Sequence, residues 1–399
     1  MFPLLSGLKV IDLSSVVMAP FVGQILGDMG ADVIKVEPLE GDVARSTHPT
    51  FGRGMSAMFA NNNRNKRSIS LNLKDPRGAN VLRTLVSQSS VFLHNIRPKA
   101  IQRLGFDFAA VRSINPKVIY CATVGYGRNG RYRDHAAFDD IIQAASGLAA
   151  LQGRVSSAPS YVPSIIADKV TALYAAYGIL AAVVAQANRT HDAIELEVPM
   201  FETMVSFLLN EHLGSATFDI EGVPGYERLL VKHRRPYRTK DGWLAVLPYT
   251  TDQWTRFLSY IERNDILAAR WFMDPIERNQ IIGQLYEVVA GILPVRTTAE
   301  WLSILEEIDV PHAKINDFQD LLSDPHLQDV GFFTSGFFES SGHARAIKQP
   351  VVVHNVNRSA DRPAPLRGEH SSEVLLKAGL TAREIECLIY DGVVGQSSR

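Results

Sequence analysis

The sequence predicts an α/β protein built around a mainly parallel β-sheet, with a second, smaller α+β domain. Two observations support this fold class. Short β-rich runs alternate with helical stretches over residues 8–125, an order typical of parallel strands joined by crossover helices. The alternation of strands and helices then ends after Gly214. A loop rich in glycine and proline follows, and after it come a predicted hairpin and amphipathic helices.

The first part of the chain contains the predicted strands of the sheet. Pro76 and Pro98 stand in the first turns of two predicted helices, where proline is tolerated because its missing N–H would lack a partner anyway. Ligands of a parallel sheet collect at the carboxyl ends of its strands, so the loops that follow the strands are candidate sites. The predicted strands are residues 8–13, 32–36, 68–73, 91–94 and 118–124, and the helices are residues 21–29, 76–88 and 98–104.

More helices follow the predicted sheet. Residues 138–151, 164–186 and 199–213 read as helices and residues 193–198 as a strand. The helix over residues 164–186 is rich in Ala, Ile, Leu and Val on nearly all sides, which predicts a central, buried position.

Residues 225–325 read as a smaller inserted domain. A hairpin is predicted over residues 234–248, because the Asp-Gly pair at its centre favours a tight turn. Helices are predicted at 252–262, 275–289 and 299–308, and a strand at 346–354 with a helix at 371–380 returns to the first domain. We therefore predict a large domain whose first part spans residues 1–214, a small domain at 225–325 and a return to the large domain at 330–399.

Composition excludes several classes of function. The 41 Lys and Arg residues balance 42 Asp and Glu residues, so there is no basic excess to support a nucleic-acid or membrane partner. Cys121 and Cys387 form no disulfide framework and no zinc pattern, so no metal is expected. No signal peptide is seen at the N-terminus, and the longest apolar run, residues 179–185, is shorter than the ~20 residues of a spanning helix. We expect a soluble, cytoplasmic protein.

Residues 125–130 match the GxGxxG pattern of dinucleotide-binding loops. The match follows the fifth predicted strand instead of the first, and the acidic residue expected about 20 positions later is missing. A loop that supports some other ligand is therefore favoured over an NAD site. The chain has neither a GxxxxGK[ST] motif nor a GxSxG elbow, which argues against a P-loop NTPase and a serine hydrolase.

Asp168 stands at or near the start of the most apolar predicted helix. Its position favours an N-cap, where the carboxylate accepts backbone N–H groups and meets the positive helix end. Alternatively, a carboxylate in a water-poor place can act as a nucleophile on an acyl group. Both interpretations are compatible, because a carboxylate facing a helix N-terminus stays ionised in spite of burial.

Basic residues gather after several predicted strands. They form either a solvated rim or a binding site for a phosphorylated nucleotide. The residues are Lys35, Arg45, Lys74, Arg97, Lys99 and Arg103.

With these features in hand, the sequence resembles the type III CoA-transferases, among them formyl-CoA transferase and carnitine CoA-transferase. The resemblance covers nearly the whole chain and is weakest between residues 214 and 300. The matching segments are residues 5–19, 30–45, 65–74, 95–98, 115–127, 324–332 and 368–380.

The resemblance implies a Rossmann-like large domain, a smaller domain and a homodimer of two interlocked chains. It also implies that CoA is a co-substrate, with no tightly bound cofactor. Asp168 falls on the family's nucleophile, which carries CoA as an aspartyl-CoA thioester between two carboxylic acids, and Asp139 falls on an acidic position that assists it. The residues that fall on the CoA-binding loops are Val16, Val17, Leu71, Lys74, Asn95, Ile96, Arg97 and Arg103.

Two departures from the family patterns bear on the reaction. The racemase branch of the family uses a His-Asp pair, but Phe138 precedes Asp139 here, and the nearby His135 is three residues early. Phenylalanine cannot move a proton, so a transferase is favoured over a 2-methylacyl-CoA racemase. A CoA-binding protein without catalysis is a further alternative.

Formyl-CoA transferase carries a run of glycines in its small domain, and this chain has none, which disfavours formate and oxalate as substrates. Three arginines stand in the corresponding segment. They could meet the free carboxylate of a dicarboxylic acid, or they could be ordinary hairpin charges. They are Arg234, Arg235 and Arg238.

Overall fold

The structure, a computed structural model, describes residues 1–52, 54–156, 158–189, 191–218, 221–338 and 342–397. The chain divides into two units. Unit 1 comprises Met1–Ala149, Tyr161–Phe207 and Gly331–Arg399, and unit 2 comprises Ala150–Ser160 and Leu208–Val330. The functional domains predicted at 1–214, 225–325 and 330–399 stay a prediction.

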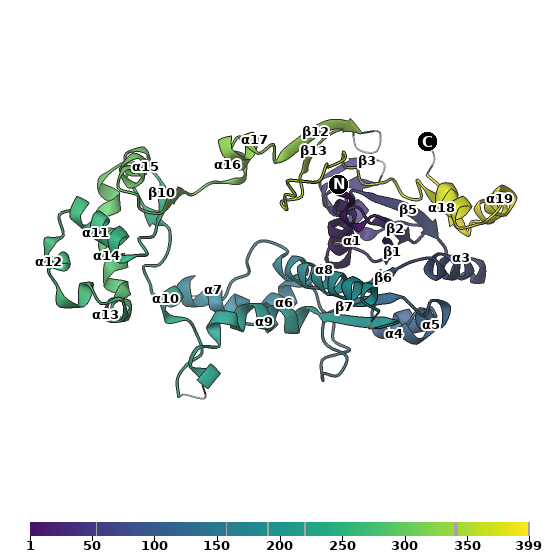
Figure 1. Cartoon of the computed structure of the whole chain (residues 1–399), viewed down its shortest axis with the longest axis horizontal. Coiled ribbons are helices and arrows are strands. Elements are labelled where there is room, and N and C mark those ends of the chain that lie inside the picture. The colour runs from purple at the N-terminus through teal and green to yellow at the C-terminus, as the bar shows by residue number, and fades with distance from the viewer. Residues whose placement is uncertain (53, 157, 190, 219–220, 339–341, 398–399) are drawn as a thin grey trace. The chain divides into compact units, whose positions relative to one another are not determined.

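A seven-stranded sheet forms the centre of unit 1, in the order β14-β5-β2-β1-β6-β7-β8 (Figure 1). All pairs are parallel except β14 with β5. The chain adds β2 and β5 on one side of β1, then returns to add β6, β7 and β8 on the other side. The strands are β1 (Lys9–Leu13), β2 (Asp32–Glu37), β5 (Lys66–Leu71), β6 (Val91–His94), β7 (Ile119–Val124), β8 (Ile194–Pro199) and β14 (Val394–Gly395). The predicted α/β class with a mainly parallel sheet is confirmed, and only the strand predicted at 68–73 is displaced, by two residues.

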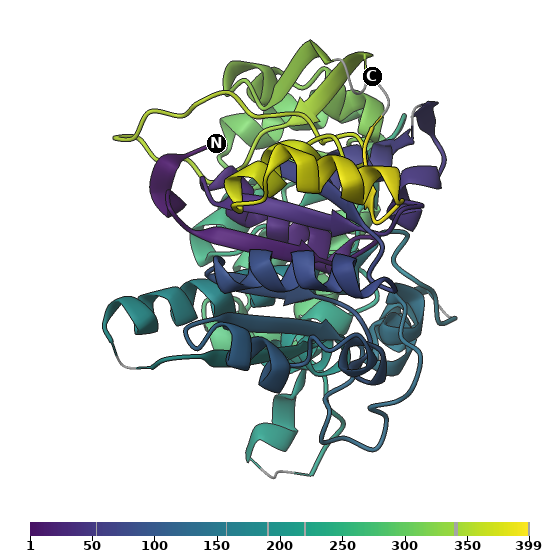
Figure 2. The same cartoon turned by 90° about the vertical axis from the view of Figure 1, so that its right-hand side faces the viewer.

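Helices cover both faces of this sheet, because successive side chains of each strand point to opposite faces. In β1, Val10 packs into the core beneath α1 (Met18–Asp28) and α8 (Ile166–Ala187). Its neighbour Ile11 packs into the other core, whose helices face the viewer in Figure 2. Those helices are α3 (Pro76–Ser87), α5 (Phe108–Ile114), α18 (Ser371–Lys377) and α19 (Ala382–Tyr390).

Only one face of α8 is buried. Ala172, Ala175 and Ile179 are fully buried, whereas Leu173 and Tyr177 are 55% and 58% exposed. The prediction of a central, buried helix is therefore confirmed for one face only. By length and composition α8 could also cross a membrane, which the short apolar runs of the sequence did not predict. Core helices meet the same criterion, and α8 packs against α1 and the sheet.

The helix predicted over residues 138–151 is two helices, α6 (Asp139–Ala145) and α7 (Leu148–Ser156). They are separated at Gly147, whose φ of 92° lies in the left-handed region that ends helices and favours glycine. The break ends α6 two turns after Asp139. The helix α9 (Met200–His212) follows β8 as predicted.

Unit 2 has its own core beside an antiparallel sheet of β9 (Tyr237–Arg238), β10 (Trp243–Val246) and β11 (His312–Lys314). The predicted hairpin is confirmed, with Thr239 N–H donating to the Gly242 carbonyl across its turn. Large aromatic side chains, among them Trp254, Tyr286 and Trp301, fill the core. The helices are α10 (Glu227–Leu230), α11 (Thr251–Tyr260), α12 (Asn264–Leu267), α13 (Pro275–Gln280), α14 (Ile282–Ile292) and α15 (Thr298–Glu307).

The strand predicted at 346–354 is mostly wrong. Only its first two residues belong to β13 (Gly342–Ile347), which pairs with β12 (Phe333–Phe338). The other helices and strands are α2 (Ala57–Asn63), α4 (Pro98–Arg103), α16 (Phe318–Leu322), α17 (Pro325–Asp329), β3 (Thr50–Gly52) and β4 (Met55–Ser56).

Charged residues are buried between α1 and the first strands of the sheet. Asp12 and Lys66 are fully buried, and their Oδ2 and Nζ atoms are 2.8 Å apart. Lys66 also donates to Asn63 and to the carbonyl of Pro20. Burial alone would raise the pKa of Asp12, but the neighbouring positive charges of Lys66 and Lys35 hold it below its ordinary value. The pair is thus ionised and fully hydrogen-bonded, as a buried pair must be.

Lys35 and Arg45, which the sequence offered as nucleotide-binding cations, are buried in the same way. Lys35 lies 2.8 Å from Asp42, and Arg45 forms two 2.7 Å hydrogen bonds with Glu37. The Arg45 guanidinium also stacks 3.6 Å from the ring centre of Phe59. Neither alternative from the sequence, a solvated rim or a nucleotide-binding site, holds for these two cations, because both are buried and paired inside the fold.

We expect Lys66→Met to lower the free energy of unfolding by about 3–5 kcal/mol, because it leaves the Asp12 carboxylate buried without its ion-pair partner. Urea denaturation measures this loss. Lys117→Met, which changes an exposed lysine, is the control and should cost less than about 0.5 kcal/mol. Equal losses in both variants would contradict the account of the pair.

Candidate active site

A cavity of about 550 Å³ lies at the carboxyl ends of β1, β6 and β7. The strand order reverses between β1 and β6, and open α/β sheets bind ligands at that point, because the loops after the two strands leave toward opposite faces. The lining residues used below are Ser15, Val16, Asn95, Ile96, Arg97, Arg103, His135, Phe138 and Asp168.

The turn after β1 has a strained backbone. Val16 has a φ of 71°, a conformation that is costly for a β-branched residue. Its N–H donates to Asp42 Oδ1 at 3.1 Å. Asn95 clamps Ser15 from the other side, accepting its N–H at 3.0 Å and donating to its carbonyl at 2.8 Å. The loops after β1 and β6 therefore form one fixed edge of the cavity.

His94, at the end of β6, supports the second of these loops from below. It is buried, and its Nδ1 accepts the N–H of Ile96 at 3.1 Å. Because Nδ1 accepts, Nε2 carries the hydrogen and donates to the hydroxyl of Tyr120, 2.7 Å away. Burial lowers the pKa of His94 to about 4, so the ring stays neutral. The sequence analysis missed this residue, whose partner Tyr120 lies on the next strand.

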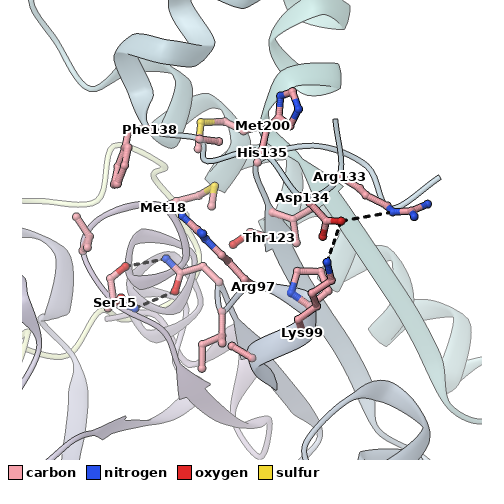
Figure 3. A pocket seen from close by; sticks show the side chains of 18 of the residues that line it. Ser15, Met18, Arg97, Lys99, Thr123, Arg133, Asp134, His135, Phe138 and Met200 are labelled. Atoms are coloured by element: carbon pink, nitrogen blue, oxygen red, sulfur yellow. Dashed lines mark hydrogen bonds and ion pairs between the residues drawn. The ribbon is translucent and has the colours of Figure 1, made fainter. Parts of the chain in front are cut away.

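Two arginines supply unpaired positive charge to the cavity. Arg97 and Arg103 are exposed and have no carboxylate partner within the described ranges. Lys99, by contrast, is already paired: it lies 3.0 Å from Asp134, which Arg133 also approaches (Figure 3). Arg97 and Arg103 can therefore bind phosphate or carboxylate groups without breaking an existing ion pair.

Three of the predicted CoA-binding residues lie outside the lining of this cavity. Lys74 is exposed beyond the end of β5. Val17 and Leu71 are 3% and 1% exposed, so both are inside the fold. The cavity brings together the others, which are Val16, Asn95, Ile96, Arg97 and Arg103.

Asp168 lines the cavity from the first turn of α8. The N-cap of α8 is Ile165, and Asp168 is the third residue of the helix, so the prediction that it caps the helix is wrong. Burial and the nearby charge of Asp139 raise its pKa to about 6. Asp168 is therefore a weaker acid than a carboxylate that caps a helix. Its anion is correspondingly more basic and more nucleophilic.

Asp139 is the first residue of α6 and contacts the backbone of Asp168. Its Oδ1 accepts the backbone N–H of Asp168 at 3.1 Å, and its Oδ2 accepts Gln143 Nε2 at 2.7 Å. Asp139 is not among the lining residues of the cavity. Its contacts thus hold the helix start and the charge of Asp168, which is a positioning role.

Gln143 is the centre of this arrangement and was also missed by the sequence analysis. It is fully buried. Besides Asp139, its Nε2 reaches the carbonyls of Val162 and Ser164 at 3.2 and 3.3 Å, and its Oε1 accepts the N–H of Val162 at 2.8 Å. One side chain therefore ties α6 to the segment that leads into α8.

In the glycine-rich loop at residues 125–130, the amides of Gly127 and Arg128 are already hydrogen-bonded to carboxylates. Glu202 accepts the N–H of Gly127, and Glu197 accepts the N–H of Arg128, both at 3.0 Å. These carboxylates would repel a pyrophosphate, so the loop is not a dinucleotide site of the ordinary kind.

Phe138 and His135 both line the cavity with Asp168. Phe138 is 71% exposed, and the His135 ring lies near those of Tyr126 and Tyr132. An apolar ring thus lines the cavity at Phe138, and His135 is a histidine of the same lining.

Comparison with known proteins identifies the family. The family model described as CoA-transferase family III matches residues 5–371. The chain belongs to CoA-transferase family III. It is 30% identical to a succinate–glutarate CoA-transferase of Agrobacterium fabrum, with 94% of this chain and 95% of the relative aligned. It is 29% identical to an (R)-2-hydroxy-4-methylpentanoate CoA-transferase of Clostridioides difficile, over 96% and 97%.

Among solved structures, a CAIB/BAIF family protein from Brucella suis matches with a TM-score of 0.79 and 26% identity, over 95% of this chain and all of that chain. The protein is an enzyme of the CoA-transferase type, with a CoA thioester as co-substrate. The resemblance seen in the sequence is confirmed, and the cavity at the strand reversal is its candidate active site.

We expect the rate of CoA transfer to fall as the pH drops below about 6, where the Asp168 carboxyl becomes protonated. In Asp139→Asn this fall should move to lower pH, because removal of the neighbouring negative charge lowers the pKa of Asp168. The pH profile of kcat measures the shift. Asp140→Asn, in the same exposed helix turn, is the matched control, and an equal shift there would contradict the assignment.

We expect Gln143→Glu to lower kcat by about 100-fold with little change in the KM for acyl-CoA, because a misplaced catalytic group slows chemistry more than binding. A carboxylate at this position cannot donate to Asp139 or to the two carbonyls. Steady-state kinetics measures both constants. The same substitution at exposed Gln88 should change neither, and a rise in KM alone for Gln143→Glu would refute the positioning role.

Proposed function

We propose that the protein moves CoA between carboxylic acids through an aspartyl-CoA thioester on Asp168. The observation that carries this proposal is the Asp168 carboxylate in the cavity, with its pKa raised to about 6. A carboxylate of this basicity is ionised near neutral pH yet more nucleophilic than an ordinary aspartate.

The proposed reaction has four steps. The Asp168 carboxylate attacks the thioester carbonyl of the donor, which forms a mixed anhydride and releases the CoA thiolate. The thiolate attacks the Asp168 carbonyl, which forms the aspartyl-CoA thioester and releases the donor acid. The acceptor carboxylate then attacks this thioester to give a second anhydride and the thiolate, and the thiolate attacks the acceptor's acyl carbon, which regenerates Asp168. Backbone N–H groups must stabilise the oxyanions, and water must be kept out.

In this proposal the loops after β1 and β6 bind CoA. Arg97 and Arg103 meet its phosphates, and Lys74 extends the site beyond the cavity. Val16, Asn95 and Ile96 contact CoA within the cavity, and Val17 and Leu71 contribute backbone groups. These assignments are supported by the exposure of the three cations and the clamped geometry of the loops.

We propose dicarboxylic acids as the substrate class. Relatives from Agrobacterium and from man are named for succinate and glutarate. The proposal also includes a cytoplasmic location and an interlocked homodimer in which residues 1–214 and 330–399 bind CoA. The exposed apolar side chains of α8 and α9, such as Tyr177, Val184 and Phe207, support a dimer because they need a covering surface.

The test is mass spectrometry of the protein after incubation with acyl-CoA thioesters such as succinyl-CoA and glutaryl-CoA. We expect CoA to be attached to Asp168, and both the adduct and CoA exchange to be absent in Asp168→Ala. Asp140→Asn is the control and should form the adduct. Transfer without an adduct would refute the mechanism. Exchange of the 2-proton of a 2-methylacyl-CoA in deuterated water, with no transfer, would favour proton transfer by His135 instead.

A further inference from the structure

Two of the loops that line the cavity are joined by an exposed ion pair. Lys99, on α4 after β6, lies 3.0 Å from Asp134, which belongs to the loop after β7 (Figure 3). Both residues line the cavity, and their side chains are 77% and 53% exposed. Among the hydrogen bonds and ion pairs of the described residues, no other one joins residues 126–138 to residues 95–103. The pair is therefore the polar link between these two loops.

The loop after β7 also has contacts of its own that do not involve Lys99. The ring centre of the buried Tyr126 lies 5.7 Å from that of Tyr132 and 6.1 Å from that of His135. His135 donates its backbone N–H to the carbonyl of Tyr132 at 2.8 Å. Asp134 lies between these two residues in the chain, so we expect the loop to keep its conformation when the Asp134 carboxylate loses Lys99.

The lining of the cavity carries more positive than negative charge. Two carboxylates, Asp134 and Asp168, stand against four cations of the described lining. The hydrogen bond from Lys99 lowers the pKa of Asp134, so Asp134 is an anion at neutral pH. A carboxylate of the protein thus lies among the cations that an anionic ligand would use. The four cations are Arg97, Lys99, Arg103 and Arg133.

The ion pair between Lys99 and Asp134 is easily exchanged for another. An exposed ion pair contributes little to stability, because water solvates both partners well when they separate. A phosphate group carries up to two negative charges and three acceptor oxygens, so it attracts an ammonium group more strongly than a single carboxylate does. Lys99 can therefore leave Asp134 for a phosphate at small cost.

We propose that Lys99 binds a phosphate group of CoA and gives up Asp134 to do so. Asp134 is then a competing anion, because it occupies Lys99 in the free protein and its charge repels the phosphate in the complex. CoA therefore binds less tightly than the cations alone would allow, which favours release of the CoA thioester product. This proposal rests on the placement of CoA proposed above, and it assigns a binding role to Lys99 and an opposing role to Asp134.

Calorimetric titration with free CoA at low ionic strength tests the proposal. We expect the Kd to rise about 3- to 10-fold in Lys99→Met and to fall by about the same factor in Asp134→Asn, which corresponds to about 0.7–1.4 kcal/mol of binding free energy. In about 0.5 M salt both changes should be less than about twofold, because salt screens exposed charges. Pantetheine, the arm of CoA without phosphates, should bind the wild type and both variants equally.

The double variant tests the exchange itself. Lys99→Met should raise the Kd for CoA about two- to threefold more in the Asp134→Asn background than in the wild type, because Lys99 has no ion pair to break there. Lys377→Met removes a lysine from another exposed ion pair of unit 1, 2.8 Å from Glu373, and should leave the Kd unchanged. Equal effects of Lys99→Met in both backgrounds, or weaker CoA binding by Asp134→Asn, would overturn the proposal.

Arg97→Met separates this inference from the placement of CoA. We expect it to weaken CoA binding about tenfold. If it does so while the Lys99 and Asp134 variants bind CoA like the wild type, the exchange is refuted and the placement stands. If Arg97→Met also binds CoA like the wild type, the placement in this cavity fails and the exchange fails with it. All of these variants replace exposed side chains, so we expect them to fold.

Discussion

The active site depends on the reversal of strand order between β1 and β6. After β1 the chain turns into α1, which packs in the core with α8, and after β6 it turns into α4, whose Ile101 belongs to the opposite core. The two loops separate at the sheet edge and leave a cavity between them. Asn95 joins the loops across this gap by hydrogen bonds to Ser15. The same topology therefore creates the cavity and fixes its rim.

Asp168, the proposed nucleophile, is placed by a second constraint, which is the contact between α6 and the start of α8. Asp139 accepts the Asp168 N–H, so a negative charge is held close to another carboxylate. Gln143 keeps this arrangement from relaxing because it is buried and binds both segments. The raised pKa of Asp168 is thus a consequence of fixed geometry. In the proposed reaction, this higher basicity favours the attack of the carboxylate on the donor thioester.

Several features could be predicted from sequence because they depend on neighbouring residues. The β-rich runs predicted five of the six sheet strands in place, and the resemblance over nearly the whole chain predicted the family. The roles of Asp168 and of the loops after β1 and β6 stay predictions. The failures have a common physical cause. In the sequence, Lys35 and Arg45 look like surface cations. In the structure they are buried in ion pairs with Asp42 and Glu37. Gln143 and His94 were missed because each also binds a partner far along the chain, Val162 and Tyr120, which lie 19 and 26 positions away. The exposed face of α8 is invisible in its composition, which is apolar on all sides.

The strained turn at Val16 shows how the buried charges and the active site are connected. A β-branched residue at positive φ costs about 1–3 kcal/mol and persists only where its surroundings over-determine it. Asp42 holds the Val16 N–H, and Lys35 holds both Asp42 and the carbonyl of Ser14. The ionic network beneath the sheet edge therefore has two effects. It neutralises charges inside the fold, and it fixes the backbone of the turn at the edge of the cavity that Asp168 also lines.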